Sequence, residues 1–138
     1  MYAFELCRRY QDAINAGQLG AVMALFEPGA TITTPLAGTL GVEEYHRRLL
    51  GHTRQTISRL LNVFEGLNGA PSVALYLQHT LIMASGKSVE FTAIDVYQFS
   101  ADRQRFISIH ILYDSAPVRA QLTREQLAGF TLGTDPAG

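Results

Sequence analysis

The sequence has little charge and a single cysteine, and each scarcity excludes a class of protein. Cys7 has no partner within the chain, which excludes a disulfide-stabilised secreted domain and favours a reducing cytoplasm. Eleven basic residues balance twelve acidic ones for a net charge of -1, and no window concentrates the basic residues as a nucleic-acid groove requires. We therefore expect no nucleic-acid partner.

Long hydrophobic runs are also missing. Gln78, His79, Glu90 and Asp95 interrupt the most apolar segments, so no stretch reaches the roughly 18 apolar residues of a membrane span. The N-terminus places Glu5 and an arginine pair where a signal peptide has its apolar run. We expect a cytoplasmic protein without a membrane partner.

Apolar residues are abundant: they make up 47% of 138 residues, a length typical of one domain. This content exceeds what one small core needs, which indicates a ligand pocket, a subunit interface or both. We expect a single domain over residues 1–130 and a loose tail over residues 131–138.

The spacing of apolar residues predicts helices followed by strands. We expect helices at residues 2–16, 19–26 and 42–50, a short strand at 30–34, a turn-rich loop at 35–41, and strands at 56–65, 72–84, 87–99 and 105–114. The last four runs are joined by hairpin-length segments and should form an antiparallel meander, which makes the fold class α+β. One further helical turn is expected after Pro117.

A family resemblance rests on four segments, together with this order of elements. Arg9-Tyr10, Ala13 to Gly17, Met23 to Phe26 and Ala30 to Pro35 resemble the opening of ketosteroid isomerases and SnoaL-like polyketide cyclases, which belong to the nuclear transport factor 2-like superfamily. The resemblance implies a cone-shaped, curved antiparallel sheet that three N-terminal helices close around an apolar cavity.

The resemblance also implies catalytic residues. Tyr10 falls where the isomerases have their oxyanion-hole tyrosine, and Asp95 falls where they have an aspartic acid held protonated in an apolar site. The isomerase general base would precede Pro35, but Thr34 stands there, and its hydroxyl cannot accept a carbon-bound proton at neutral pH. The segment that ends at Asp114 resembles the SnoaL-like tail, where an aspartate is the general acid/base.

Strand alternation places Asp95 on one face with Phe91, Tyr97 and Phe99. If that face lines the cavity, Asp95 is a carboxyl group among aromatic rings, where desolvation disfavours its charge. It could instead be a structural aspartate held by backbone amides or by an arginine. Tyr10, on an apolar helical stripe, could likewise be a core tyrosine, and a hydrogen bond to Asp95 would suit either role.

Residues 72–84 alternate between two apolar faces. We expect Tyr76 and Gln78 to face the cavity, and Leu75, Leu77, His79, Leu81 and Met83 to form the outer face. That outer face is too apolar for water and predicts a homodimer. A slip of one residue would exchange the two faces and bring the histidines into the pocket.

The remaining reactive residues favour structural roles. His79 and His110 are expected on the outer face, and His46 and His52 on an exposed helix side and its loop. No histidine pair has zinc-site spacing, so neither a metal nor a cofactor is expected. Cys7 lies on a helical apolar stripe and is interpreted as a core residue.

Two functions remain open. One is cofactor-independent acid/base catalysis, isomerisation or aldol-type cyclisation, on an apolar carbonyl compound. The other is a binding module for an apolar small molecule that has lost its base at Thr34. Catalytic roles are expected for Tyr10, Asp95 and Asp114, and ligand contacts for Thr34, Tyr76, Gln78, Phe91, Tyr97, Phe99, Ile109, Ile111 and Tyr113.

Overall fold

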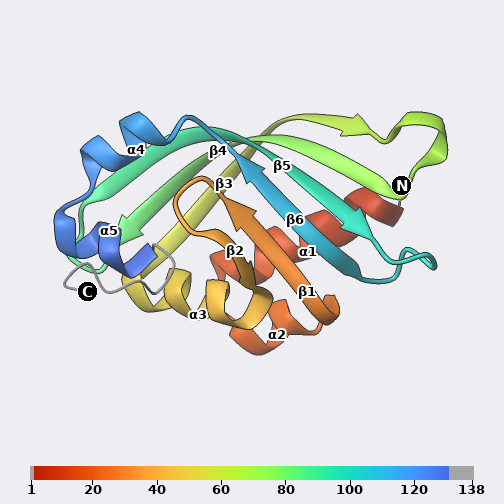
Figure 1. Ribbon diagram of the computed structural model, residues 1–138, viewed down its shortest axis with the longest axis horizontal. Helices are drawn as coiled ribbons and strands as arrows, with labels where there is room; N and C mark the ends of the chain where they lie inside the picture. The colour runs from red at the N-terminus through yellow and green to blue at the C-terminus, as the bar shows by residue number, and fades with distance from the viewer. Residues whose placement is uncertain (1, 131–138) are drawn as a thin grey trace.

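The computed structural model describes residues 2–130, which form five helices and a six-stranded sheet (Figure 1). A short 3-10 turn, η1, spans Leu67–Gly69. In chain order the other elements are α1 (Tyr2–Asn15), α2 (Leu19–Met23), β1 (Phe26–Thr34), β2 (Gly38–Gly41), α3 (Val42–His52), β3 (Thr53–Glu65), β4 (Ser72–Met83), β5 (Ser88–Phe99), β6 (Phe106–Leu112), α4 (Ser115–Gln121) and α5 (Arg124–Phe130).

The strands form one curved, unclosed sheet in the order β2-β1-β6-β5-β4-β3. Strands β3 to β6 form the predicted antiparallel meander, and the α+β fold class is confirmed. Three features differ from the sequence prediction. The expected second helix ends at Met23 instead of residue 26, and β1 begins at Phe26 instead of residue 30. The expected loop at 35–41 contains β2, which pairs antiparallel with β1, and β1 in turn pairs parallel with β6. The segment after Asp114 forms two helices instead of one turn, while the expected tail at 131–138 lies outside the described residues.

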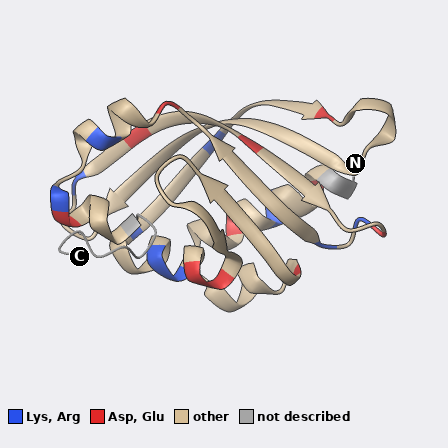
Figure 2. Ribbon diagram, viewed as in Figure 1, with Lys and Arg blue, Asp and Glu red and all other residues tan. Residues whose placement is uncertain are grey.

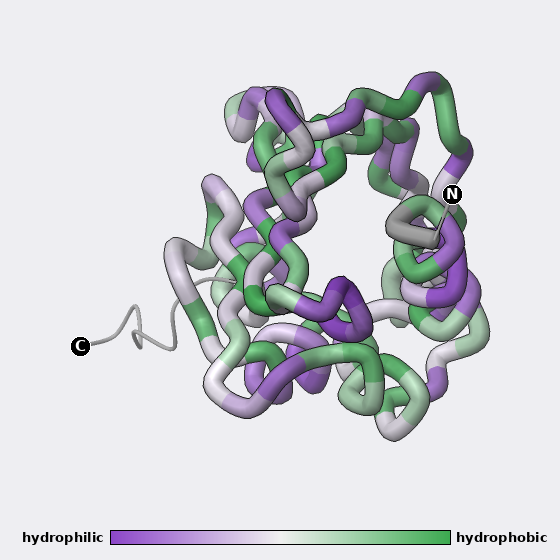
Figure 3. Tube along the Cα trace, turned by 90° about the vertical axis from the view of Figure 1, so that its right-hand side faces the viewer, coloured by the Kyte–Doolittle hydropathy of each residue, from purple (hydrophilic) through white to green (hydrophobic). Residues whose placement is uncertain are grey.

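Helices α1, α2 and α3 lie along one side of the sheet (Figures 1 and 3). Helix α1 forms because Leu6, Cys7 and Tyr10 recur at three- and four-residue steps, and all three are at most 2% exposed. The Tyr10 ring packs edge-on against Phe26 and Phe106, with centroids 5.6 and 5.7 Å away. This packing attaches α1 to β1 and β6 and holds the helix against the concave face.

The faces of β4 are the reverse of the prediction. Leu75 and Leu77 are 1% and 2% exposed, whereas Tyr76 is 37% exposed. The reason is the register: Leu75 lies opposite Asp95, and directly opposite residues of an antiparallel pair share one face. The odd-numbered residues of β4, His79 included, therefore point to the concave side. Tyr76 and Gln78 lie on the outer face, so their predicted orientation is wrong.

The outer face of the sheet still carries apolar side chains. Tyr76, Ile94, Ile107 and Leu112 are between 37% and 53% exposed there. Charged residues are sparse along the strands and lie mostly on helices and loops (Figure 2). Among the described residues, no helix is long and apolar enough to cross a membrane.

Candidate functional site

A small, mainly apolar cavity of about 70 Å³ lies between the helices and the concave face of the sheet. No lysine or arginine is among its lining residues. A ligand carboxylate or phosphate would therefore find no lysine or arginine to pair with in the cavity. Six of the residues expected from the sequence do line it: Tyr10, Thr34, Phe91, Asp95, Ile111 and Tyr113.

The other predicted residues lie elsewhere. Tyr97, Phe99 and Ile109 are buried in the core and are not among the residues that line the cavity. Asp114 is exposed at the start of α4, where its Oδ1 accepts a hydrogen bond from the backbone N–H of Ala116 at 3.1 Å. That contact is a typical N-cap, which satisfies a free amide at the helix start.

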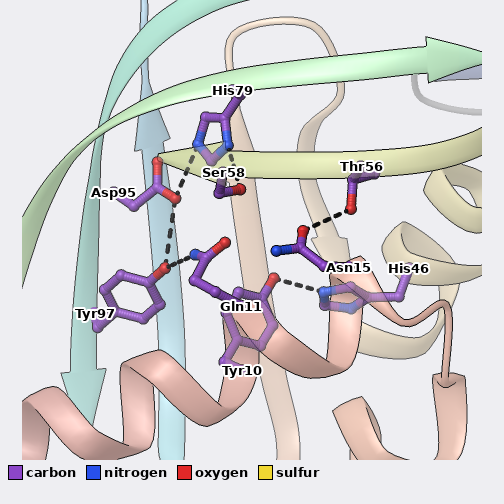
Figure 4. A network of polar contacts seen from close by, with 9 residues as sticks. All are labelled: Tyr10, Gln11, Asn15, His46, Thr56, Ser58, His79, Asp95 and Tyr97. Carbon is purple, nitrogen blue, oxygen red and sulfur yellow. Dashed lines mark hydrogen bonds and ion pairs between the residues drawn. The ribbon is translucent and has the colours of Figure 1, made fainter. Parts of the chain in front are cut away.

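Asp95 is the centre of a polar row that crosses four elements (Figure 4). Gln11 of α1 donates through Nε2 to the Tyr97 hydroxyl at 2.6 Å, and Tyr97 donates to Asp95 Oδ2 at 3.4 Å. On the other side, His79 Nε2 lies 3.3 Å from the same Oδ2. The row ends at Ser58 of β3, whose Oγ lies 3.0 Å from His79 Nδ1.

Two buried atoms in this row have no hydrogen-bond partner among the described residues: His79 Nε2 and Asp95 Oδ1. Nε2 is within ion-pair distance of Oδ2, but the directions of the two groups do not meet hydrogen-bond geometry. An unpaired buried polar atom costs about 1–3 kcal/mol. The His79–Asp95 pair is therefore suited to complete its hydrogen bonding with a bound molecule.

Tyr10 has a different partner from the one expected. Its hydroxyl lies 2.6 Å from His46 Nε2, and His46 Nδ1 lies 2.8 Å from the Val42 carbonyl oxygen. A carbonyl can only accept, so Nδ1 carries the hydrogen and Nε2 accepts from Tyr10. The expected bond from Tyr10 to Asp95 is not formed, because the hydroxyl hydrogen is already donated to His46.

His46 is fully buried, which corrects its predicted place on an exposed helix side. Burial lowers its pKa to about 4, so the ring is neutral near pH 7. Burial, together with the nearby Tyr45 and Asp95, raises the pKa of the Tyr10 hydroxyl. Both groups are thus uncharged and serve to join α1 to α3.

An aromatic wall flanks the His79–Asp95 pair. The His79 and Phe91 ring centroids are 5.3 Å apart, and those of Phe91 and Tyr113 are 4.7 Å apart. Burial raises the pKa of Tyr113 to about 12, although a hydrogen bond with Thr34 lowers it in part. Thr34 Oγ1 also accepts from the backbone N–H of Ala37 at 2.9 Å. The threonine has no basic group to offer a ligand.

Comparison with known proteins decides the family. Residues 7–106 match the model of the SnoaL-like domain, most of the chain. The chain belongs to the SnoaL-like domain family. This confirms the resemblance seen in the sequence and places the protein in the nuclear transport factor 2-like superfamily. No curated protein matches the sequence.

Solved structures share the SnoaL-like fold at low identity. An NTF2-like protein of unknown function from Burkholderia pseudomallei is 16% identical with a TM-score of 0.75, over 89% of this chain and 98% of that one. The epoxide hydrolase/cyclase-like enzyme SalBIII is 19% identical with a TM-score of 0.69, over 81% and 90%. A protein with a ketosteroid isomerase-like fold from Catenulispora acidiphila is 12% identical with a TM-score of 0.72, over 85% and 91%.

Four residues of this SnoaL-like site were not predicted as such. Gln11 and Ser58 were missed, and His46 and His79 were expected at other positions. Among the described residues, no group of three or more His, Cys, Asp or Glu side chains is placed to hold a metal ion. The sequence alone carried no decisive signal for His79, because β4 is apolar on both faces and the register with β5 decides which face points inward. His110, in contrast, is exposed on β6 as expected.

Proposed function

We propose that this SnoaL-like protein is an enzyme that transfers a proton on a small, neutral, apolar carbonyl compound without a cofactor. The observation that carries the proposal is the buried His79–Asp95 pair at an apolar cavity, with Nε2 and Oδ1 free of hydrogen bonds in the described structure. A histidine beside a carboxylate is a common general acid/base. Asp114 was the expected acid/base, but it is exposed at the start of α4 and does not line the cavity, so His79 takes this role.

The proton moves between the substrate carbon and His79. The neutral imidazole removes a proton next to the substrate carbonyl, and Asp95 stabilises the imidazolium that forms. The net charge of the site does not change, because the negative enolate and the positive imidazolium form in the same step. Return of the proton to another carbon gives isomerisation. Attack of the enolate on a second carbonyl, followed by protonation of the new alkoxide by His79, gives aldol-type cyclisation.

Cavity size and polarity support a small neutral substrate. The volume of about 70 Å³ is well below the roughly 300–1,000 Å³ of pockets for drug-sized ligands. Leu81, Phe91 and Ile111 line it and favour apolar contacts. A small ring ketone is therefore a better fit than a complete steroid.

A binding module without catalysis is the second candidate. The specific observation in its favour concerns Thr34, which falls where the family resemblance puts the isomerase base and whose Oγ1 already accepts a hydrogen bond from the backbone N–H of Ala37. A protein of this kind would hold the ligand through the aromatic wall and the free polar atoms of His79 and Asp95. It would leave the ligand chemically unchanged.

Hydrogen–deuterium exchange next to a carbonyl separates the two candidates. Cyclohexanone and indanone are incubated with the protein in heavy water, and NMR measures loss of the α-hydrogen signals. We expect exchange by the wild type and a loss of about 10²–10⁴-fold in His79→Gln and Asp95→Asn, the usual contribution of a positioned base.

The matched control is His110→Gln, which removes an exposed histidine from the neighbouring region of the same sheet. This variant should exchange like the wild type. Line broadening of a ketone without any exchange would establish the binding module instead. Exchange that survives His79→Gln would show that another group is the base.

A further inference from the structure

Ser58 is the end of the polar row on β3 and has no part in the proton transfer proposed above. It lies on β3 directly opposite His79 of β4, and it lines the cavity. Its Oγ is 3.0 Å from His79 Nδ1, and His79 Nε2 is 3.3 Å from Asp95 Oδ2 (Figure 4). The Asp95 and His79 side chains are 2% and 13% exposed, so this row is shielded from bulk water.

The direction of the hydrogen bonds follows from the other end of the row. The Gln11 amide nitrogen can only donate, so the Tyr97 oxygen accepts from it and its own hydrogen points to Asp95. A carboxylate beside Nε2 favours the histidine tautomer with its hydrogen on Nε2. In this tautomer Nδ1 carries the lone pair and accepts the hydroxyl hydrogen of Ser58. In the other tautomer Nε2 carries the lone pair and Nδ1–H donates to Ser58, and that is the form the proton transfer above uses.

A hydroxyl that donates to a histidine, which a carboxylate in turn orients, is the arrangement that activates a nucleophile. We propose that Ser58 is such a nucleophile and accepts an acyl group from small neutral aryl esters. This activity goes beyond proton transfer but depends on the same His79–Asp95 pair. In serine proteases Nε2 faces the serine and Nδ1 the aspartate. Here Nδ1 faces the serine and Nε2 faces the aspartate, so Ser58 and Asp95 each still lie beside one ring nitrogen of His79.

The chemical step balances within the site. Ser58 Oγ forms a bond to the ester carbonyl carbon, and its proton moves to His79 Nδ1. The bond from that carbon to the aryl oxygen breaks, and the departing aryloxide takes the proton from Nδ1. Water then attacks the acyl-serine in the same way, which releases a carboxylic acid and restores the hydroxyl.

The cavity sets the class of ester. Its apolar lining without lysine or arginine favours a neutral acyl group and an aromatic leaving group that can pack near Phe91 and Tyr113. Ser58 lies within a strand and not at the start of a helix, where amide groups would stabilise an oxyanion. We therefore expect reaction with activated esters, whose leaving group departs readily.

The test uses para-nitrophenyl acetate with the intact protein. Nitrophenolate release is followed by absorbance, samples are quenched in acid, and mass spectrometry of peptides locates the acetyl group. We expect acetylation of Ser58, with a rate about 100-fold or more lower in His79→Gln because the proton acceptor is removed. Ser58→Ala should abolish the initial burst of nitrophenolate.

Thr56 provides a matched control in the same cavity. It precedes Ser58 on the same face of β3, but its Oγ1 donates to Asn15 Oδ1 at 3.1 Å and not to a histidine. Thr56 should remain unmodified, and His110→Gln, which removes an exposed histidine outside the cavity lining, should acetylate at Ser58 like the wild type. If Ser58→Ala folds poorly, Ser58→Cys replaces it: its thiol should be acetylated at a rate that still depends on His79.

Three results would overturn the proposal: no acetyl group on Ser58, acetylation only of His79 or Lys87, or an equal rate in His79→Gln. None of these outcomes depends on ketone exchange. Acetylation of Ser58 without exchange would leave the nucleophile established and the proton-transfer function refuted. Ketone exchange without acetylation of Ser58 would establish the proton transfer and refute Ser58 as a nucleophile.

Discussion

The buried His46–Tyr10 pair makes stability depend on pH in a predictable way. His46 is 0% exposed, and its two ring nitrogens are occupied by the Val42 carbonyl and the Tyr10 hydroxyl. Protonation of Nε2 would remove the acceptor for Tyr10 and place a charge in the core. The titratable groups packed against the ring are Tyr10 and Tyr45, whose pKa values burial raises, so both stay neutral in acid.

The magnitude follows from the change in the His46 pKa on folding. The pKa falls from 6.5 to about 4. Since one pKa unit is worth about 1.4 kcal/mol, the difference corresponds to about 3 kcal/mol. The unfolded chain binds the proton more tightly, so this stability is complete above about pH 6.5 and is lost progressively as the pH falls toward 4.

Urea unfolding of the wild type and of His46→Gln between pH 4 and 8 measures this effect. The wild type should lose about 3 kcal/mol more than the variant across that range. His110→Gln, which removes an exposed histidine, should behave like the wild type. Equal pH dependence in the wild type and His46→Gln would refute the assignment of a neutral, buried His46.

Three further outcomes are expected. Tyr10→Phe should lower the free energy of unfolding by about 1–3 kcal/mol, because it leaves a buried acceptor unpaired, yet ketone exchange should change little; a loss as large as in His79→Gln would restore Tyr10 as an oxyanion donor. In the His79→Gln background, Thr34→Asp should restore isomerase activity by up to about 10²–10⁴-fold, measured on a β,γ-unsaturated ketone, and no gain would remove Thr34 from the base position. We expect a homodimer through the outer face at micromolar concentration, and Ile94→Asp should dissociate it in sedimentation experiments, since an unpaired charge in an apolar interface is strongly unfavourable; a monomeric wild type would contradict this.

Local patterns in the sequence determined most elements of the fold. The four-strand meander and the third helix follow from alternation and from three- and four-residue spacing, which depend only on neighbouring residues. The same alternation placed Phe91 and Asp95 at the cavity, because only one face of β5 is strongly apolar. Family resemblance added Tyr10 and Thr34, and both line the cavity.

Pairings between distant segments were decided by tertiary structure alone. Strand β4 is apolar on both faces, so its own residues could not show whether Tyr76 or Leu75 points inward; the register with β5 decides it. That register places His79 beside Asp95, and the pairing with β3 adds Ser58. Thirty-six residues separate Tyr10 from His46. A hydrogen bond over that distance depends on how two helices pack, and helix spacing within either segment carries no information about it.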